Sequence, residues 1–178
     1  MQLEETREAL NKFAKYVVQQ SRSNLTKSDK NVSKELYNSL GYDLNVSKNS
    51  FSLSLLMEDY GMFQDKGVKG KTSSAKAPNS PFQFGSGTGK KGGLRNGIDK
   101  WVRRRRFQFR DKKGRFMSYQ STAFLITRSI YNKGIKPSMF FTKPFEKAFK
   151  GLNEELIQAY ALDVQKFMET TIKDNFKK

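Results

Sequence analysis

The densest group of chemically capable side chains is a run of cations in the middle of the chain. The full set is Lys90, Lys91, Arg103, Arg104, Arg105, Arg106, Arg110, Lys112, Lys113 and Arg115. The planar guanidinium of arginine binds phosphate through paired donors, and each neutralised phosphate releases counterions. The alternative is a solvated face. We interpret this segment as the candidate site for binding nucleic acid or an acidic partner protein.

Aromatic residues alternate with these cations and extend the range of chemistry. Phe107, Phe109, Phe116 and Tyr119 lie among the basic positions, and aromatic rings next to cations can stack on bases. No helix-turn-helix or RNA-recognition signature is present, so sequence-specific readout is not expected. If nucleic acid is bound, the sequence predicts contacts that do not depend on base identity.

The excess positive charge is confined to one part of the chain. Of the net charge of +17, residues 67–136 contribute +16, with 18 basic and 2 acidic residues. Residues 1–66 are neutral, with nine of each sign, and residues 137–178 add +1. This distribution indicates a nearly neutral scaffold that carries one basic region.

Two other groupings could do chemistry, and we favour neither. Glu58, Asp59 and Asp65 could hold a metal ion in a nuclease, but acidic residues that begin a helix give the same pattern and nothing else completes a site. The glycine-rich run at residues 85–91 lacks the phosphate-loop spacing, because Phe84 occupies the first glycine position and Lys91 the Ser/Thr position. A glycine loop is the better interpretation.

Composition removes most enzyme classes. The chain contains no cysteine and no histidine, which excludes thiolate catalysis and the commonest general base and metal ligand. No apolar run is long enough to span a bilayer, and the first residues do not form a secretory signal. We therefore expect a non-enzymatic protein that binds no cofactor, metal ion, small molecule or membrane.

Hydrophobic periodicity predicts the scaffold around the basic region. A first helix is expected from residue 3 to residues 21–24, followed by a short helix at residues 32–40 with Gly41 as its C-cap. Alternation of apolar and polar residues then predicts a β-hairpin at residues 42–57.

The second half of the chain is predicted to be loop and helix. A glycine- and lysine-rich mobile loop is expected at residues 68–93, then a helix at residues 94–106 and a short basic hairpin or protruding loop. The next helix is expected to be capped by Ser118 or Ser121 and to stop at Gly134. Thr142 is expected to begin a long final helix with one apolar stripe. The predicted class is α+β, with a small antiparallel sheet and long terminal helices. We expect one domain at residues 1–150, with its basic segment at 90–115, and a helical extension at residues 151–178.

The order of these pieces is similar to that of the tail-completion proteins, the neck or head–tail joining proteins of tailed bacteriophages. The resemblance lies in residues 59–67 (DYGMFQDKG) after the hairpin and in residues 134–145 (GIKPSMFFTKPF) before the last helix. Residues 98–102 (IDKWV) and 123–130 (AFLITRSI) resemble the longer-loop branch of that family. The similarity covers about residues 1–150.

The resemblance implies a virion protein assembled in the bacterial host cytoplasm. Such protomers form rings of six or twelve copies between the head connector (portal) and the tail, with DNA passing through the centre. Closure by head-to-tail contacts would place these aromatic residues at the subunit interface: Tyr60, Phe63, Phe82, Phe84, Phe140 and Phe141. The alternative hypothesis is a cytoplasmic nucleic-acid-binding protein without sequence specificity, based on the +16 middle segment.

Overall fold

The structure is a computed structural model that describes residues 3–28, 33–47, 50–87 and 92–176. Its contacts divide the chain into two units. Unit 1 comprises Met1–Lys27, Glu35–Glu58 and Phe140–Lys178, and unit 2 comprises Ser28–Lys34 and Asp59–Met139. The expected boundary between residues 150 and 151 does not coincide with this division, because it falls inside a continuous helix.

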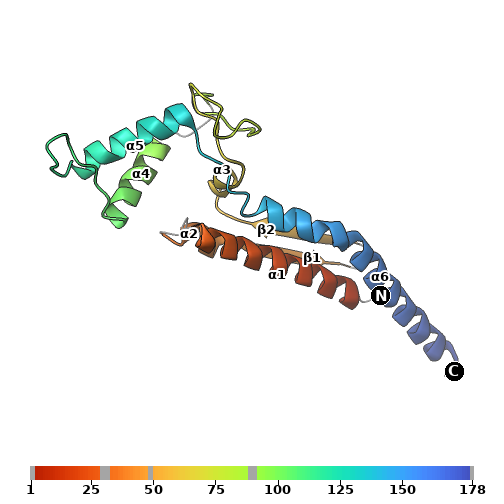
Figure 1. The fold of residues 1–178 in the computed structure, drawn as a ribbon. Coiled ribbons are helices and arrows are strands. Elements are labelled where there is room, and N and C mark those ends of the chain that lie inside the picture. The colour runs from red at the N-terminus through yellow and green to blue at the C-terminus, as the bar shows by residue number, and fades with distance from the viewer. Residues whose placement is uncertain (1–2, 29–32, 48–49, 88–91, 177–178) are drawn as a thin grey trace. The chain divides into compact units, whose positions relative to one another are not determined.

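The described residues of unit 1 form two long helices, one short helix and a β-hairpin (Figure 1). Its elements are α1 (Glu4–Lys27), α2 (Glu35–Ser39), β1 (Gly41–Val46), β2 (Phe51–Leu56) and α6 (Thr142–Phe176). Helices α1 and α6 lie side by side and antiparallel. At one end Lys166 forms an ion pair with Glu5 at 2.5 Å, and at the other Asn24 donates a hydrogen bond to the carbonyl of Phe140 at 3.1 Å.

The core of unit 1 lies between the hairpin and the two helices. Phe13 and Val17 of α1 pack against Leu152 of α6, with Leu53 and Leu55 of β2 partly buried against them. A second cluster closes the other end and contains Val18, Leu25, Leu36, Leu40 and Phe140. Burial of these side chains supplies the main stabilisation of this unit.

The β-hairpin confirms the predicted alternation. Tyr42 pairs with Leu55 and Leu44 with Leu53, and these side chains are partly buried, while Asp43 and its cross-strand partner Ser54 are exposed. The prediction for Gly41 was wrong. It begins β1 and pairs with Leu56, because α2 ends at Ser39.

In its described residues, unit 2 contains three helices joined by long loops. They are α3 (Gly61–Lys66), α4 (Gly93–Arg104) and α5 (Tyr119–Lys133). Helices α4 and α5 pack on each other around Val102, Thr122 and Ala123, which are almost fully buried. Of the two predicted caps, Ser118 is the one that caps α5, since its Oγ accepts a hydrogen bond from the N–H of Ser121 at 3.1 Å.

Glycines bring the segment after α3 against the segment after α5. Val68 and Ile135 exchange two main-chain hydrogen bonds of 3.0 and 2.8 Å. A Cβ atom at Gly70 would lie 2.0 Å from the Asn132 carbonyl oxygen, and one at Gly134 would lie 2.3 Å from the Val68 oxygen. Gly134 also has a φ of +81°, which disfavours other residues. We call these contacts the glycine junction.

The predicted glycine- and lysine-rich loop follows this junction. Residues 67–87 form no helix and no extended strand in the structure. The main chain of Lys69 is nevertheless hydrogen-bonded within the loop: its N–H donates to the Phe82 carbonyl at 2.8 Å, and its carbonyl accepts from the Phe84 N–H at 2.9 Å. Ser80 is buried and donates to the Gly67 carbonyl at 2.7 Å. The loop therefore has a defined path as far as residue 87, and its mobility stays a prediction.

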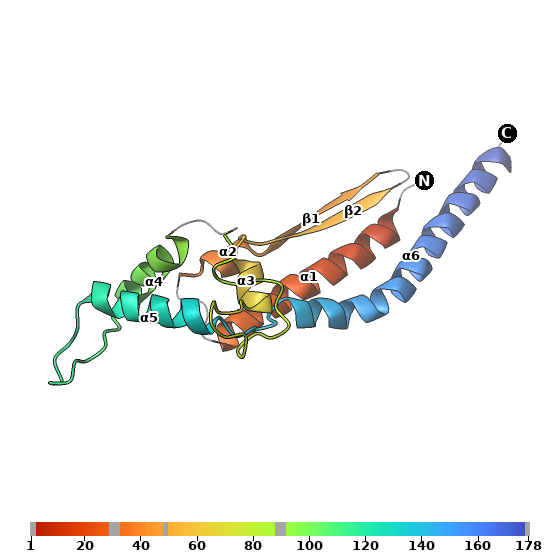
Figure 2. The same ribbon diagram turned by 90° about the horizontal axis from the view of Figure 1, so that it is seen from above.

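The apolar stripe predicted for helix α6 is only partly covered in the structure. Leu152 and Ala159 are buried, but Phe149, Tyr160, Phe167 and Ile172 are about half exposed. The reason is that α1 covers only one side of α6, and α6 continues past the first residues of α1 (Figure 2). Within the described residues, no helix combines the length and apolar character needed to cross a membrane.

Candidate nucleic-acid interface

The basic segment begins where α4 ends. Arg105 and Phe107 donate main-chain hydrogen bonds of 2.9 Å back to the carbonyls of Trp101 and Val102, and Arg106 adopts a left-handed conformation with a φ of +52°. This closes the helix and turns the chain into a loop. The loop between α4 and α5 extends away from these two helices (Figure 2).

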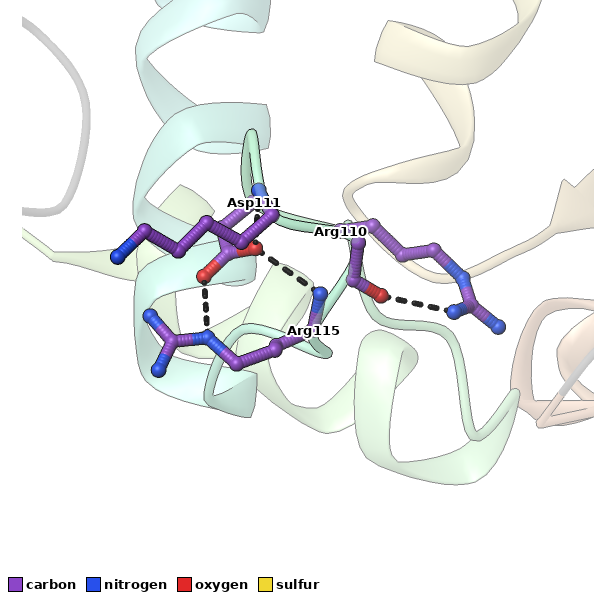
Figure 3. A network of polar contacts seen from close by, with 5 residues as sticks. Arg110, Asp111 and Arg115 are labelled. Carbon is purple, nitrogen blue, oxygen red and sulfur yellow. Dashed lines mark hydrogen bonds and ion pairs between the residues drawn. The ribbon is translucent and has the colours of Figure 1, made fainter.

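The tip of this loop is a tight turn organised by Asp111. Its Oδ1 accepts hydrogen bonds of 2.9 Å from the main-chain N–H groups of Lys113 and Arg115, and its Oδ2 accepts from Arg115 Nε at 3.0 Å (Figure 3). Gly114 N–H donates to the Asp111 carbonyl at 3.0 Å, with a φ of +78° at Gly114. The carboxylate thus holds both sides of the turn.

These contacts change the acidity of Asp111. The main-chain hydrogen bond from Arg115 has the largest effect and lowers the pKa of the carboxyl below its ordinary value. Slight burial raises the pKa, while the side chain of Arg115 and the N–H of Lys113 lower it further. The lowered pKa favours the ionised form of Asp111, which is the form that accepts these hydrogen bonds.

Arg110 and Phe116 close the hairpin from the two strands. They form an isolated antiparallel bridge, and the Arg110 guanidinium lies 4.1 Å from the centre of the Phe116 ring. Arg110 Nη1 also donates to the Gly114 carbonyl at 2.8 Å. A cation over an aromatic face is attractive, so the predicted basic hairpin is present and supported by its own residues.

The base of the hairpin is anchored to the helices. Met117 N–H donates to the Phe109 carbonyl at 2.8 Å, and Phe109 N–H donates to Thr122 Oγ1 of α5 at 3.3 Å. The Phe107 ring packs edge-on against Phe109 and tilted against Trp101 of α4. Of the aromatic residues that alternate with the cations, Phe107 and Phe109 therefore contact each other, whereas Phe116 lies beneath Arg110 and Tyr119 beneath Arg103.

The cations of this segment are exposed and differ in their partners. Arg103 pairs with Asp99 at 2.9 Å and Arg115 pairs with Asp111. Among the described residues, the side chains of Arg106, Lys112 and Lys113 have no such partner. Arg104 and Arg105 are exposed as well. Lys90 and Lys91, the first two predicted members, lie outside the described residues.

The expected interface aromatics have mixed environments. Tyr60 and Phe63 are 38% and 42% exposed, and Phe82 packs edge-on against Phe63. Phe84 contacts the Tyr131 ring. The prediction that Phe140 lies at the subunit interface was wrong. Its side chain is 1% exposed inside the core of unit 1 and offers no surface to another subunit. Phe141 is partly buried beside that core.

The three carboxylates considered for a nuclease do not share one environment. Glu58 and Asp59 are exposed, whereas Asp65 is fully buried. The Asp65 carbonyl accepts hydrogen bonds from the N–H groups of Ser138 and Met139 at 3.1 and 3.0 Å. In the part of the chain that the structure describes, no group of three or more acidic side chains could hold a metal ion.

Comparison with known proteins gave no match to a protein-family model, to a curated protein or to a solved structure.

Proposed function

We propose that this chain is a structural protein of the neck of a tailed bacteriophage, where a ring of copies joins the head connector to the tail around the DNA path. The proposal rests on the resemblance to tail-completion proteins. The structural observation that carries it furthest is the glycine junction. The two segments that bear the resemblance, residues 59–67 and 134–145, are far apart in sequence and meet there.

The contacts of the junction involve the signature residues themselves. Ser138 donates through its N–H and its Oγ to the Gln64 carbonyl, at 3.1 and 2.6 Å. A Cβ atom at Gly67 would lie 2.5 Å from the Ile135 carbonyl oxygen and 2.7 Å from Pro137 N. Each signature thus has a structural reason for its glycine, and the two together form one compact element. This supports treating them as parts of one motif.

Assembly into a ring is supported by apolar side chains that unit 1 leaves uncovered. Ile157, Met168 and Ile172 of α6 are 71%, 59% and 55% exposed, and Phe167 is 48% exposed. Exposed apolar side chains gathered on one helix mark a surface that a partner covers. In the proposed ring, neighbouring copies or tail proteins cover this part of α6.

The proposal is tested by removing the chain from an assembling phage. Deletion of its gene is expected to yield DNA-filled heads and free tails that accumulate separately in the lysate, visible by electron microscopy. Supplying the gene from a plasmid should restore joined particles. Normal yields of joined, infectious particles from the deletion strain would overturn the proposal.

A further inference from the structure

The hairpin between α4 and α5 has a surface that the ring proposal does not use. We propose that residues 103–115 bind the phosphate backbone of duplex DNA without sequence specificity. The inference is carried by the geometry of unit 2 and does not depend on the neck assignment. Its ligand class is the duplex phosphodiester backbone.

The segment that forms the hairpin is strongly cationic. Residues 103–115 carry eight arginine and lysine side chains against the single carboxylate of Asp111, a net charge of +7. That carboxylate is engaged by Lys113 N–H and by Arg115, so it is turned toward the hairpin's own backbone. The cations of Arg106, Lys112 and Lys113 are exposed with no partner among the described residues.

The tip of the hairpin is already ordered in the free protein. Lys112 and Lys113 occupy the turn between Asp111 and Gly114, and the turn is closed by hydrogen bonds that do not involve their ammonium groups. Arg110 is held over Phe116. A tip that is already ordered loses less conformational entropy on binding than a free chain would. The hairpin therefore holds the backbone positions of Lys112 and Lys113 in a fixed turn, with Arg110 fixed over Phe116.

The aromatic residues favour backbone contacts over base stacking. The Phe107 ring contacts both Phe109 and Trp101, and one face of Phe116 is covered by Arg110. Each ring is therefore engaged by a neighbouring side chain, although 37–63% of its surface stays exposed. Duplex DNA carries about one negative charge per 1.7 Å of axis, so it is the nucleic acid that best matches a cluster of cations.

An acidic protein is a weaker match for the tip. Protein interfaces centre on buried aromatic or aliphatic anchors. Residues 110–115 contain only Arg, Asp, Lys and Gly. The ring that follows them, Phe116, is 63% exposed with the Arg110 guanidinium over one face, so this end of the hairpin has one exposed ring in place of an apolar cluster. Multiple arginines and lysines without an apolar centre are typical of phosphate contacts.

The test is fluorescence anisotropy of a labelled 24-base-pair duplex titrated with the purified full chain at several salt concentrations. Arg106, Lys112 and Lys113 are changed together to Gln. The matched control changes Arg128, Lys133 and Lys136 to Gln, which removes the same charge from exposed positions elsewhere in unit 2. Circular dichroism verifies that both variants are folded.

The proposal predicts at least tenfold weaker binding for the hairpin variant at low salt. The slope of log affinity against log salt concentration should also be shallower by about 3, because each of the three lost phosphate contacts contributes about 0.9 to that slope. The control should bind within about threefold of the wild type. Equal losses of affinity in the two variants would overturn the proposal, because they would show that binding depends on the total charge of the chain and not on the hairpin.

Two competitors test the chemical class of the ligand. Unlabelled duplex of unrelated sequence should displace the probe as well as the original duplex does. Tighter binding of a single-stranded 24-mer would overturn the duplex assignment in favour of base stacking. Displacement by polyglutamate at equal charge concentration would overturn it in favour of an acidic protein. Absence of any duplex binding at low salt would also overturn it, and would leave the neck proposal standing.

Discussion

The carboxylate of Asp163 on α6 caps the first turn of α1 at Thr6. Asp163 Oδ2 accepts hydrogen bonds from Thr6 N–H at 3.0 Å and from Thr6 Oγ1 at 2.8 Å, and Oδ1 accepts from Glu5 N–H at 3.0 Å. Both Asp163 and Thr6 are almost fully buried. The first N–H groups of a helix have no partner within it. Here another helix supplies that partner, and it also places a negative charge at the positive end of the α1 dipole.

Replacing this carboxylate should destabilise unit 1. In Asp163→Asn the amide can accept only through one oxygen, so at least one N–H of α1 faces an NH₂ group. We expect a loss of about 1–3 kcal/mol in the free energy of unfolding, the usual cost of a buried donor left without its acceptor. Urea unfolding followed by circular dichroism measures it. The control Glu155→Gln makes the same charge change at an exposed position of α6 and should stay within about 0.5 kcal/mol.

The same contact predicts a dependence of stability on pH. Burial raises the pKa of Asp163, but the hydrogen bonds from Thr6 and Glu5, with the charge of Lys166, outweigh burial and lower the pKa below its ordinary value. A lowered pKa in the folded state stabilises the protein above the unfolded-state pKa of about 3.9. That stability is lost as the pH falls through the folded-state pKa. The loss in the acid range should be smaller in Asp163→Asn, and an identical pH profile would contradict this role.

The glycine junction predicts a contrast between glycine positions in unit 2. Gly70→Ala and Gly134→Ala each place a Cβ against main-chain oxygen and should lower the free energy of unfolding by at least about 2 kcal/mol. Gly97→Ala lies in α4 with open space around it and should raise stability by about 0.5–1 kcal/mol. Trp101, the single tryptophan, belongs to this unit, so its fluorescence during urea unfolding reports the change. Similar effects of all three variants would refute the packing argument.

The uncovered side of α6 predicts a change in association. Ile157→Glu puts a charge on a side chain that is 71% exposed, so the fold should be unaffected. Burial of that charge at an interface is costly, and self-association should weaken at least tenfold in sedimentation experiments. Gln158→Glu is the matched control at the next exposed position. Equal association of the two variants would show that this side of α6 is not an interface.

The turn of the basic hairpin predicts local protection from hydrogen exchange. In Asp111→Ala the amides of Lys113 and Arg115 lose their acceptor, so both should exchange several-fold faster in NMR experiments. Asp99→Ala removes the partner of Arg103 with the same charge change and should leave these amides unchanged. Because the Asp111 pKa is lowered, wild-type protection should persist to a lower pH than an aspartate with an ordinary pKa would allow.

Sequence patterns predicted correctly those elements that are determined by residues close together in the chain. The hairpin followed from alternation in strands only six residues long, and α5 followed from Ser118 at its start and Gly134 at its end. Each signal lies within a few residues of the structure it produces. The basic hairpin was predicted for the same reason, from a turn sequence between phenylalanines.

Contacts between distant residues could not be predicted in this way. Asp163 and Thr6 are separated by 157 positions, and no pattern near either residue indicates the other. Phe140 was expected at a subunit interface, but the segment before α6 enters the core of unit 1 and buries it. Periodicity marked the apolar residues of α6 without showing which of them α1 covers. The role of Asp111 could have been suspected from its place before Lys-Lys-Gly, a common turn sequence.

The central claim is that the chain is a component of the phage neck. Its most direct test is quantitative mass spectrometry of gradient-purified particles from the culture that produces the protein, scaled to the major capsid protein. The account predicts a fixed stoichiometry between a few and about twelve copies per particle, as a closed ring requires. Absence of the chain from particles, with all of it in the soluble lysate, would contradict the account.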